Sequence, residues 1–168
     1  EDIRSTILAG AEKVSLNSQA VKHPELITEG ARIFGNQCIV LGMDAAKDPE
    51  APSGYSVYIN GGRVKTGLDA REWAIKAVEL GAGEIVLNSI DADGMKNGYE
   101  INLTKMIAES VGVPVIASGG GGTPQHMADV LKEGKADAAL IASMVHSMGY
   151  TVNGIKDDLN KLGVPVRL

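Results

Sequence analysis

The stretch VIASGGGGTPQHMADVL, residues 115–131, runs from an apolar segment through four glycines into a segment with helical spacing. Its first residues, VIA (115–117), form a short apolar run bounded by turn residues, which is typical of a strand buried on both faces. Thr123 then precedes Pro124, in the way that a capping residue precedes a proline at the first position of a helix. The glycines are therefore predicted to lie in a strand-to-helix loop.

A strand-to-helix loop without side chains can bind an anion. Gly119 to Gly122 can adopt positive φ and let an anion approach backbone N–H groups at a helix N-terminus, where the helix dipole also favours negative charge. This pattern predicts a phosphate site. A flexible or tight turn that binds no ligand explains the same four glycines, so the loop alone leaves both interpretations open.

Apolar runs alternate with helical patterns along the whole chain, which predicts right-handed βαβ units and a parallel sheet of buried strands. The predicted strands are residues 13–17, 38–44, 84–91, 113–120 and 137–143. The helical patterns, each of which ends in glycine, are residues 25–35, 69–83, 125–134 and 155–163. The connection after Asp44 is longer, and its segment GYSVYINGGRVKTG (54–67) predicts a hairpin with an Asn-Gly-Gly turn, which we expect to lie near the site.

Residues 1–18 and 125–143 share one pattern, a helix, a glycine and a strand that ends in a hydroxyl residue, so that Ser18 matches Ser143. The glycine-rich loop precedes only the second copy. Five parallel strands cannot close a barrel, and an open set would leave long apolar edges. We therefore expect a longer protein to supply further strands.

Polar residues follow the predicted strands at their C-terminal ends, where parallel α/β folds bind ligands. Asp44 ends an otherwise apolar run, and its carboxylate is a candidate general acid or base, with a structural N-cap or loop anchor as the alternative. Asp91 and Asp93 compete for the same role. Because Asp93 precedes a glycine, it is equally plausible as a turn residue or as an acceptor for substrate hydroxyls.

The internal repeat predicts two phosphate cradles and hence a substrate with two phosphates. One cradle would involve the loop Ser118–Gly120 together with Ala142 and Ser143, and the other would involve Asn17 and Ser18. For the second pair, the alternative is a helix N-cap that binds only its own backbone.

The composition predicts one soluble domain over residues 1–168, without a linker, because 44% of the residues are hydrophobic and 22% are charged. A net charge of −5 without a basic cluster, and only 4% aromatic residues, argue against a nucleic-acid partner. No apolar run reaches the roughly 20 residues that span a membrane, and no signal peptide is recognisable. Three scattered histidines suggest no metal site. We expect a cytoplasmic protein.

Three segments closely resemble the cyclase subunit of imidazole glycerol phosphate synthase, an enzyme of histidine biosynthesis. They are GAGEIVLNSIDADGMKNGY (81–99), PVIASGGGGTPQHM (114–127) and AALIAS (138–143). The resemblance covers essentially all 168 residues. It implies a (β/α)8 TIM barrel with two-fold internal duplication, of which this chain would be strands four to eight without the first three.

The resemblance also implies an activity, that of a lyase without a cofactor. Ammonia and a doubly phosphorylated ribulosyl aminoimidazole carboxamide nucleotide would give imidazole glycerol phosphate and aminoimidazole carboxamide ribotide. Asp44 matches one of the family's two catalytic aspartates. The other lies at the end of the first strand, which has no counterpart here, so we expect the chain alone to be inactive.

The resemblance assigns further residues to the site and to a partner. The residues implied in binding substrate and phosphate are Asn17, Ser18, Asp93, Gly94, Ser118, Gly119, Gly120, Ala142 and Ser143. Lys13 and Glu84 stand directly before strands, on the opposite face, where the sequence alone predicts solvated loop charges. The resemblance instead makes them part of a gate for ammonia from a glutaminase subunit in a heterodimer, with Glu12 near that partner.

Two alternatives remain open from the sequence. The first is a phosphate-binding half-barrel without catalysis, which would dimerise through its open edges. The second is the sister isomerase barrel of the same pathway, which is also duplicated and also binds a doubly phosphorylated ligand. The segment NSIDADGMKNGY (88–99) favours the cyclase over the isomerase.

Overall fold

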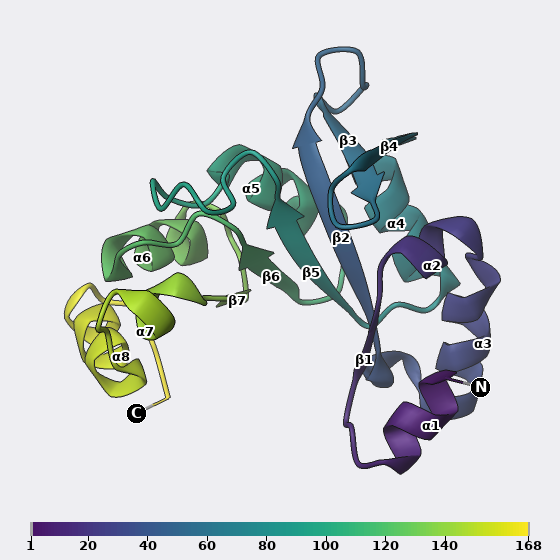
Figure 1. Cartoon of the computed structure of the whole chain (residues 1–168), viewed down its shortest axis with the longest axis horizontal. Helices are drawn as coiled ribbons and strands as arrows, with labels where there is room; N and C mark the ends of the chain where they lie inside the picture. Colours follow the sequence, from purple (N-terminus) through teal and green to yellow (C-terminus); the bar gives the residue numbers. More distant parts are fainter. Residues whose placement is uncertain (1, 168) are drawn as a thin grey trace.

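Strand β2 (Ile39–Lys47) lies at the centre of the sheet in the computed structural model, which describes residues 2–167 (Figure 1). One edge of β2 pairs in parallel with β5 (Glu84–Ser89). The other edge is shared, because its first residues pair in parallel with β1 (Val14–Leu16) and its last residues pair antiparallel with β3 (Tyr55–Ile59). The chain thus leaves the parallel sheet at the end of β2 to form a hairpin.

The parallel strands follow one another in chain order. β6 (Val115–Ser118) pairs with β5, and β7 (Ala138–Ala139) pairs with β6, which gives the order β1-β2-β5-β6-β7 across Figure 1. This order confirms the predicted α/β fold with a mostly parallel sheet, in keeping with part of a (β/α)8 TIM barrel.

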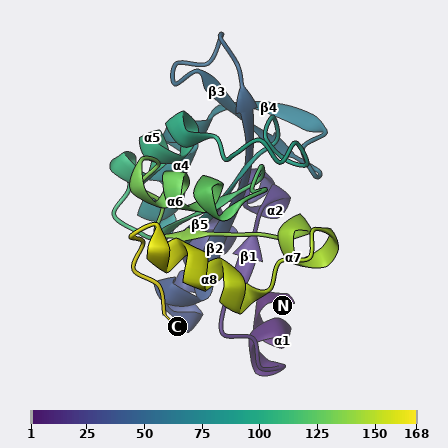
Figure 2. The ribbon, with the colours of Figure 1, turned by 90° about the vertical axis from the view of Figure 1, so that its left-hand side faces the viewer.

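From Glu25 onward, the longer helices pack side by side in one layer. The longer helices are α1 (Asp2–Leu8), α3 (Glu25–Phe34), α4 (Ala70–Leu80), α5 (Ile101–Ser110), α6 (Pro124–Lys132) and α8 (Val152–Lys161). Shorter turns of helix are α2 (Ser18–Lys22), η1 (Asn36–Cys38) and α7 (Ser143–Ser147). From α3 onward each of the longer helices contacts the next, α8 following α6. Figure 2 shows α6 and α8, at the end of this row, facing the viewer, with α7 to their right.

Alternation along β2 separates the core from the site. Ile39, Leu41, Met43 and Ala45 are buried against α3, α4 and α5, in a cluster that includes Trp73. The residues between them, among them Asp44, therefore point to the face opposite the helix layer. None of the helices within residues 2–167 is long and apolar enough to cross a membrane.

Several predicted boundaries were wrong. β1, β5, β6 and β7 are shorter than predicted, while β2 continues past Asp44 to Lys47 because β3 pairs with its last residues. Burial is confirmed for the alternating core residues of β2, β5 and β6. It is wrong for β1 and β7, since each pairs along one edge only and Ser15 and Ala138 are exposed. The sequence patterns also missed α5, whose N-cap residue, Glu100, makes no side-chain capping hydrogen bond.

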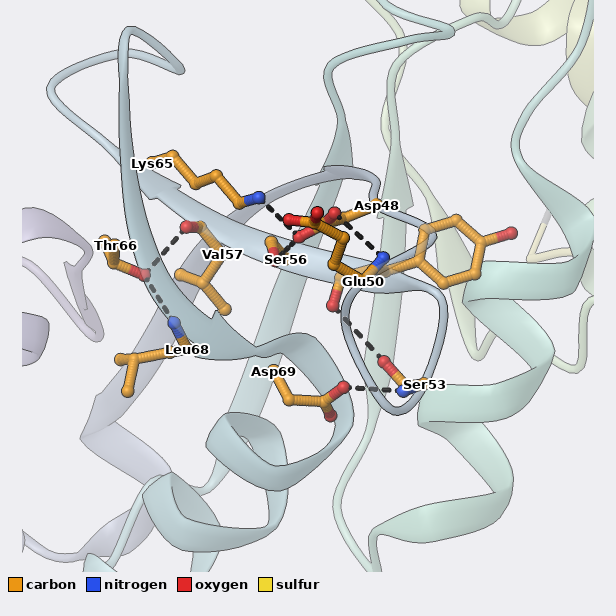
Figure 3. A network of polar contacts seen from close by, with 10 residues as sticks. Asp48, Glu50, Ser53, Ser56, Val57, Lys65, Thr66, Leu68 and Asp69 are labelled. Atoms are coloured by element: carbon orange, nitrogen blue, oxygen red, sulfur yellow. Dashed lines mark hydrogen bonds and ion pairs between the residues drawn. The ribbon is translucent and has the colours of Figure 1, made fainter.

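The predicted hairpin is confirmed as β3 and β4 (Val64–Asp69). Its turn places Asn60, Gly61 and Gly62 at positive φ. A polar network ties the hairpin to the residues that follow β2, and in it the Lys65 ammonium lies 2.7 Å from Oδ2 of Asp48 (Figure 3). At its tip, the backbone N–H of Asn60 donates to the Ser18 hydroxyl at 2.9 Å.

Candidate functional site

Asp44 is held from both sides on the face opposite the helices. The side-chain amide of Asn17, which follows β1, donates to Oδ2 at 3.0 Å. The side-chain amide of Asn88, on β5, donates to Oδ1 at 3.0 Å. Both oxygens of the carboxylate are thus oriented by neutral donors from the two neighbouring strands. The sequence predicted that the strand ends at Asp44, but β2 continues to Lys47. Asp44 instead lies where the partner of β2 changes from β1 to β3.

Glycine at position 42 lets Asn17 come close to β2. A Cβ atom at Gly42 would lie 2.9 Å from the Ser15 hydroxyl and 3.3 Å from Cβ of Asn17. Asn17 occupies the N-cap position of α2, but its side chain makes no capping hydrogen bond. The helix-cap interpretation of its side chain was therefore wrong, because the amide binds Asp44 instead. Its Oδ1 is buried and has no partner among residues 2–167, and such an acceptor suits an O–H or N–H donor rather than an anion.

A second site lies beyond Asn88. In the sheet register Asp44 pairs with Asn88, and Asn88 pairs with Ser118 at the end of β6. Neighbouring strands are about 4.8 Å apart, so this polar row extends about 10 Å across the sheet. Ser118 lines a cavity of about 140 Å³.

This cavity is lined by all the predicted substrate- and phosphate-binding residues other than Asn17 and Ser18. Its lining includes Asp93, Gly94, Ser118, Gly119, Gly120, Ala142 and Ser143. It also includes Lys96, which was not predicted from the sequence. The only feature that could have pointed to Lys96 is its place near Asp93 in the segment 81–99. These residues come from the loops after three parallel strands, as expected when strand ends share one edge of a sheet. That the cavity binds phosphate stays a prediction.

The cavity is rich in free hydrogen-bond donors. Within residues 2–167, the backbone N–H groups of Gly120, Gly121, Ala142 and Ser143 have no hydrogen-bond acceptor. All four residues line the cavity. Unpaired backbone N–H groups around a concave surface form an anion-binding environment.

The glycines of this loop also have a packing role. A Cβ atom at Gly120 would lie 2.1 Å from the carbonyl oxygen of Gly98, and one at Gly121 would lie 2.5 Å from the Tyr99 hydroxyl. The loop is tied to the same segment by a 2.9 Å hydrogen bond from Gly98 N–H to the Gly120 carbonyl. Close contact between two loops thus requires small residues here with or without a ligand. Tight packing of the loop therefore explains part of its glycine content without a ligand. The prediction of an anion site depends instead on the free backbone N–H groups.

The repeat is visible in the structure. α2 begins at Ser18 and α7 begins at Ser143, the two residues that the repeat matches, and each helix has five residues. The residues before them have similar backbone angles, φ −116 and ψ −97 at Asn17 against φ −131 and ψ −68 at Ala142. The first copy differs in its side chains, since Asn17 binds Asp44 and Ser18 binds the hairpin tip.

Asp91, the competitor of Asp44, has a structural partner. Its Oδ2 accepts a 2.8 Å hydrogen bond from the backbone N–H of Lys47. The Lys47 ammonium lies 3.1 Å from Glu100, which also accepts a 3.2 Å hydrogen bond from the Tyr55 hydroxyl. Burial, with the negative charge of Glu100, raises the pKa of Tyr55 to about 12. Asp91 thus anchors its loop to β2.

Lys13 and Glu84 form an ion pair of 2.5 Å at the other end of the strands. Lys13 precedes β1 and Glu84 begins β5, so the pair bridges the two neighbours of β2. The side chain of Glu84 is only 15% exposed. The prediction of two solvated loop charges was therefore wrong for Glu84, because its position in β5 turns the carboxylate toward Lys13.

The structure defines an α/β protein of the TIM-barrel type, with its polar residues at the C-terminal ends of parallel strands and an ion pair at the opposite ends. The model of the family described as "Histidine biosynthesis protein" matches residues 1–151, and the chain belongs to this family. No group of histidine, cysteine and acidic side chains within the described residues is arranged to hold a metal ion.

Individual relatives cover nearly the whole chain. The "Imidazole glycerol phosphate synthase subunit HisF" of Desulfatibacillum aliphaticivorans is 63% identical over 170 residues, which include 99% of this chain and 65% of the relative. The protein of the same name from Syntrophobacter fumaroxidans is 61% identical over 99% of this chain and 66% of the relative. The chain thus spans a little less than two thirds of the length of these relatives. Their names do not favour either the isomerase or the non-catalytic alternative.

Proposed function

We propose that this chain contributes five βα units to the cyclase subunit of imidazole glycerol phosphate synthase, a lyase of histidine biosynthesis. Its substrates would be ammonia and a doubly phosphorylated ribulosyl aminoimidazole carboxamide nucleotide. The products would be imidazole glycerol phosphate and aminoimidazole carboxamide ribotide. The observation that carries the proposal is the row from Asp44 through Asn88 to Ser118, which joins an oriented carboxylate to a cavity rich in backbone donors.

Each part of the row has a proposed role. Asp44 is a general acid or base, because its carboxylate is oriented and lies beside the buried acceptor Oδ1 of Asn17. The cavity between Ser118 and Ser143 binds one phosphate of the substrate through its free N–H groups. Asn17 and Ser18 are proposed to contribute to the site of the other phosphate through the backbone at the start of α2. We expect residues 1–168 alone to be inactive, because the second catalytic aspartate of the family lies on a strand outside this sequence.

We also propose a glutaminase subunit as the partner, in a cytoplasmic heterodimer. The support is the Lys13–Glu84 ion pair, which lies at the end of the strands opposite Asp44, as a gate for ammonia from that subunit requires. Lys13 is half exposed, and Glu12 beside it is exposed.

Replacing Asp44 tests the activity. In the full-length protein, Asp44→Asn should abolish ammonia-dependent turnover and leave the affinity for the phosphate ligand within a few-fold, because the amide keeps the shape but not the proton transfer. Asp91→Asn is the matched control, since its side chain can still accept from Lys47. Near-normal turnover of Asp44→Asn would remove Asp44 from the mechanism.

Replacing Lys13 tests the partner proposal. Lys13→Ala should impair glutamine-dependent turnover of the complex more than turnover with free ammonia, because only the former needs passage from the partner. Lys22→Ala, which removes an exposed lysine from α2, should change neither rate. Equal effects of Lys13→Ala on both rates would reject the gate.

A further inference from the structure

Lys96 has an unusual backbone conformation beside the cavity. It lies in the loop between β5 and α5 with φ of 59, between Gly94 at 76 and Gly98 at 108. A left-handed backbone suits glycine and disfavours residues with a Cβ atom. On conformational grounds glycine would thus be the better residue at position 96. Non-glycine residues held in this region tend to occur at ligand sites.

The backbone of Lys96 is fixed by the glycine loop. A Cβ atom at Gly122 would lie 2.5 Å from the Lys96 carbonyl oxygen and 3.0 Å from Lys96 Cβ. This close contact fixes the position of the Lys96 Cβ atom. Lys96 lines the cavity together with Ser118 and Ser143.

The charge of Lys96 is available to a ligand. None of the ion pairs within residues 2–167 includes Lys96, and the residue is exposed. Lys135 makes a useful comparison, because it also has positive φ, 54, but its ammonium lies 2.5 Å from Glu109. Lys96 therefore brings a positively charged side chain to the edge of a cavity that otherwise offers neutral N–H donors and the carboxylate of Asp93.

We propose that Lys96 is the cationic ligand of this cavity, where its ammonium binds the oxygens of a phosphate group. The inference rests on the proposed function, which places a phosphate there. A phosphate monoester carries between one and two negative charges near neutral pH, which backbone N–H groups alone do not neutralise. Lys96 thus supplies the charge, and the loop donors supply the orientation.

The test is a titration of the full-length protein with inorganic phosphate, followed by the NMR shifts of the Gly120, Gly121 and Ser143 backbone amides. Lys96→Gly should weaken phosphate binding about tenfold, as expected for loss of a charged hydrogen bond. The thermal stability of this variant should equal or exceed that of the wild type, because glycine suits the positive φ at position 96. Lys96→Gln, which keeps a long side chain, should weaken binding similarly. Lys96→Arg should retain most of the affinity. Lys135→Gly, the control for backbone conformation, should bind like the wild type.

The outcomes separate this inference from the proposed function. If phosphate shifts these amide signals in the wild type, and Lys96→Gly and Lys96→Gln bind phosphate as tightly as the wild type does, the role of Lys96 is rejected and the phosphate site stands. If phosphate shifts none of these amides even in the wild type, both the site and the role of Lys96 are overturned.

Discussion

Asn88 and Asp44 are direct neighbours in the parallel register of β2 and β5, and the amide of Asn88 donates to Oδ1 of Asp44 at 3.0 Å. Asn17 holds the other oxygen from the opposite side. Since both donors are neutral, they fix the direction of the carboxylate without placing a cation beside it. The row of side chains is therefore suited to a group that must exchange a proton.

Removing the amide of Asn88 should slow the reaction. In the full-length protein we expect Asn88→Ala to lower kcat about tenfold, which corresponds to about 1.4 kcal/mol, because one carboxylate oxygen loses its donor. KM should change little. Steady-state kinetics with ammonia would measure both, with Asn160→Ala on the exposed face of α8 as the control. An unchanged kcat would show that Asn88 does not orient Asp44 for turnover.

Asp48 makes the stability of the hairpin depend on pH. Hydrogen bonds from Lys65 and then from Ser56 hold the pKa of Asp48 below its ordinary value of 3.8. The folded state thus binds this proton more weakly than the unfolded state does. The resulting stabilisation is present above about pH 4 and is lost as the pH falls through the lowered pKa.

Asp48→Asn should therefore destabilise the protein near neutral pH, and the difference from the wild type should shrink as the pH falls below 3.8. Urea unfolding at a series of pH values would measure it. Glu50→Gln is a suitable control, because only the backbone N–H of Glu50 contacts Asp48. A difference that stays constant down to pH 2 would contradict the account.

Tyr99 links two loops that line the cavity, and its phenol has a raised pKa. Its hydroxyl donates to the Leu140 carbonyl at 2.9 Å, and burial raises its pKa from 10.0 to about 12. The folded state holds the phenol proton more tightly than the unfolded state. This stabilisation is complete below about pH 10 and is lost as the pH rises toward 12.

Tyr99→Phe should lower the free energy of unfolding by about 1 kcal/mol at neutral pH through loss of the hydrogen bond. It should also remove one tyrosinate from the part of the ultraviolet titration near pH 12. Tyr55→Phe should remove another, since the pKa of Tyr55 is also about 12. If Tyr99→Phe leaves this late phase at full amplitude, Tyr99 is not the buried phenol.

Gly120 should tolerate no side chain. Gly120 has φ of 99, and a Cβ atom there would lie 2.1 Å from the Gly98 carbonyl oxygen. Gly54 has φ of 81 with nothing within 4 Å of its Cβ position. Gly54→Ala should thus cost about 1 kcal/mol from backbone strain, while Gly120→Ala should cost about 3 kcal/mol, in the range of severe packing defects. Denaturant unfolding measures both, and equal costs would show that the loops can move apart.

Much of the fold follows from local patterns. The alternation of apolar runs with helical segments fixes the βαβ order, and the Asn-Gly-Gly turn at residues 60–62 identifies the hairpin. The cavity residues could also be predicted as a group, because the C-terminal ends of parallel strands meet at one edge. Ser118 and Ser143, at the ends of neighbouring strands, line the same cavity, as this rule predicts.

Other features depend on contacts between distant segments. The extension of β2 past Asp44 needs the pairing with β3, and the short β7 reflects pairing along a single edge. The side chain of Asn17 could cap α2 or reach Asp44, and only the approach allowed by Gly42 decides between them. The positive φ of Lys96 has no local signal, since it arises from packing of its loop against the glycines.

The order of the parallel strands also bears on how the protein is made. Each of these strands pairs with the one before it in the chain, from β1 through β2, β5 and β6 to β7. A growing polypeptide that leaves the ribosome therefore presents, at each step, the edge on which the next strand can dock. Because none of these five strands depends on a partner that is synthesised after its own neighbour in this order, this part of the sheet can assemble in the direction of synthesis.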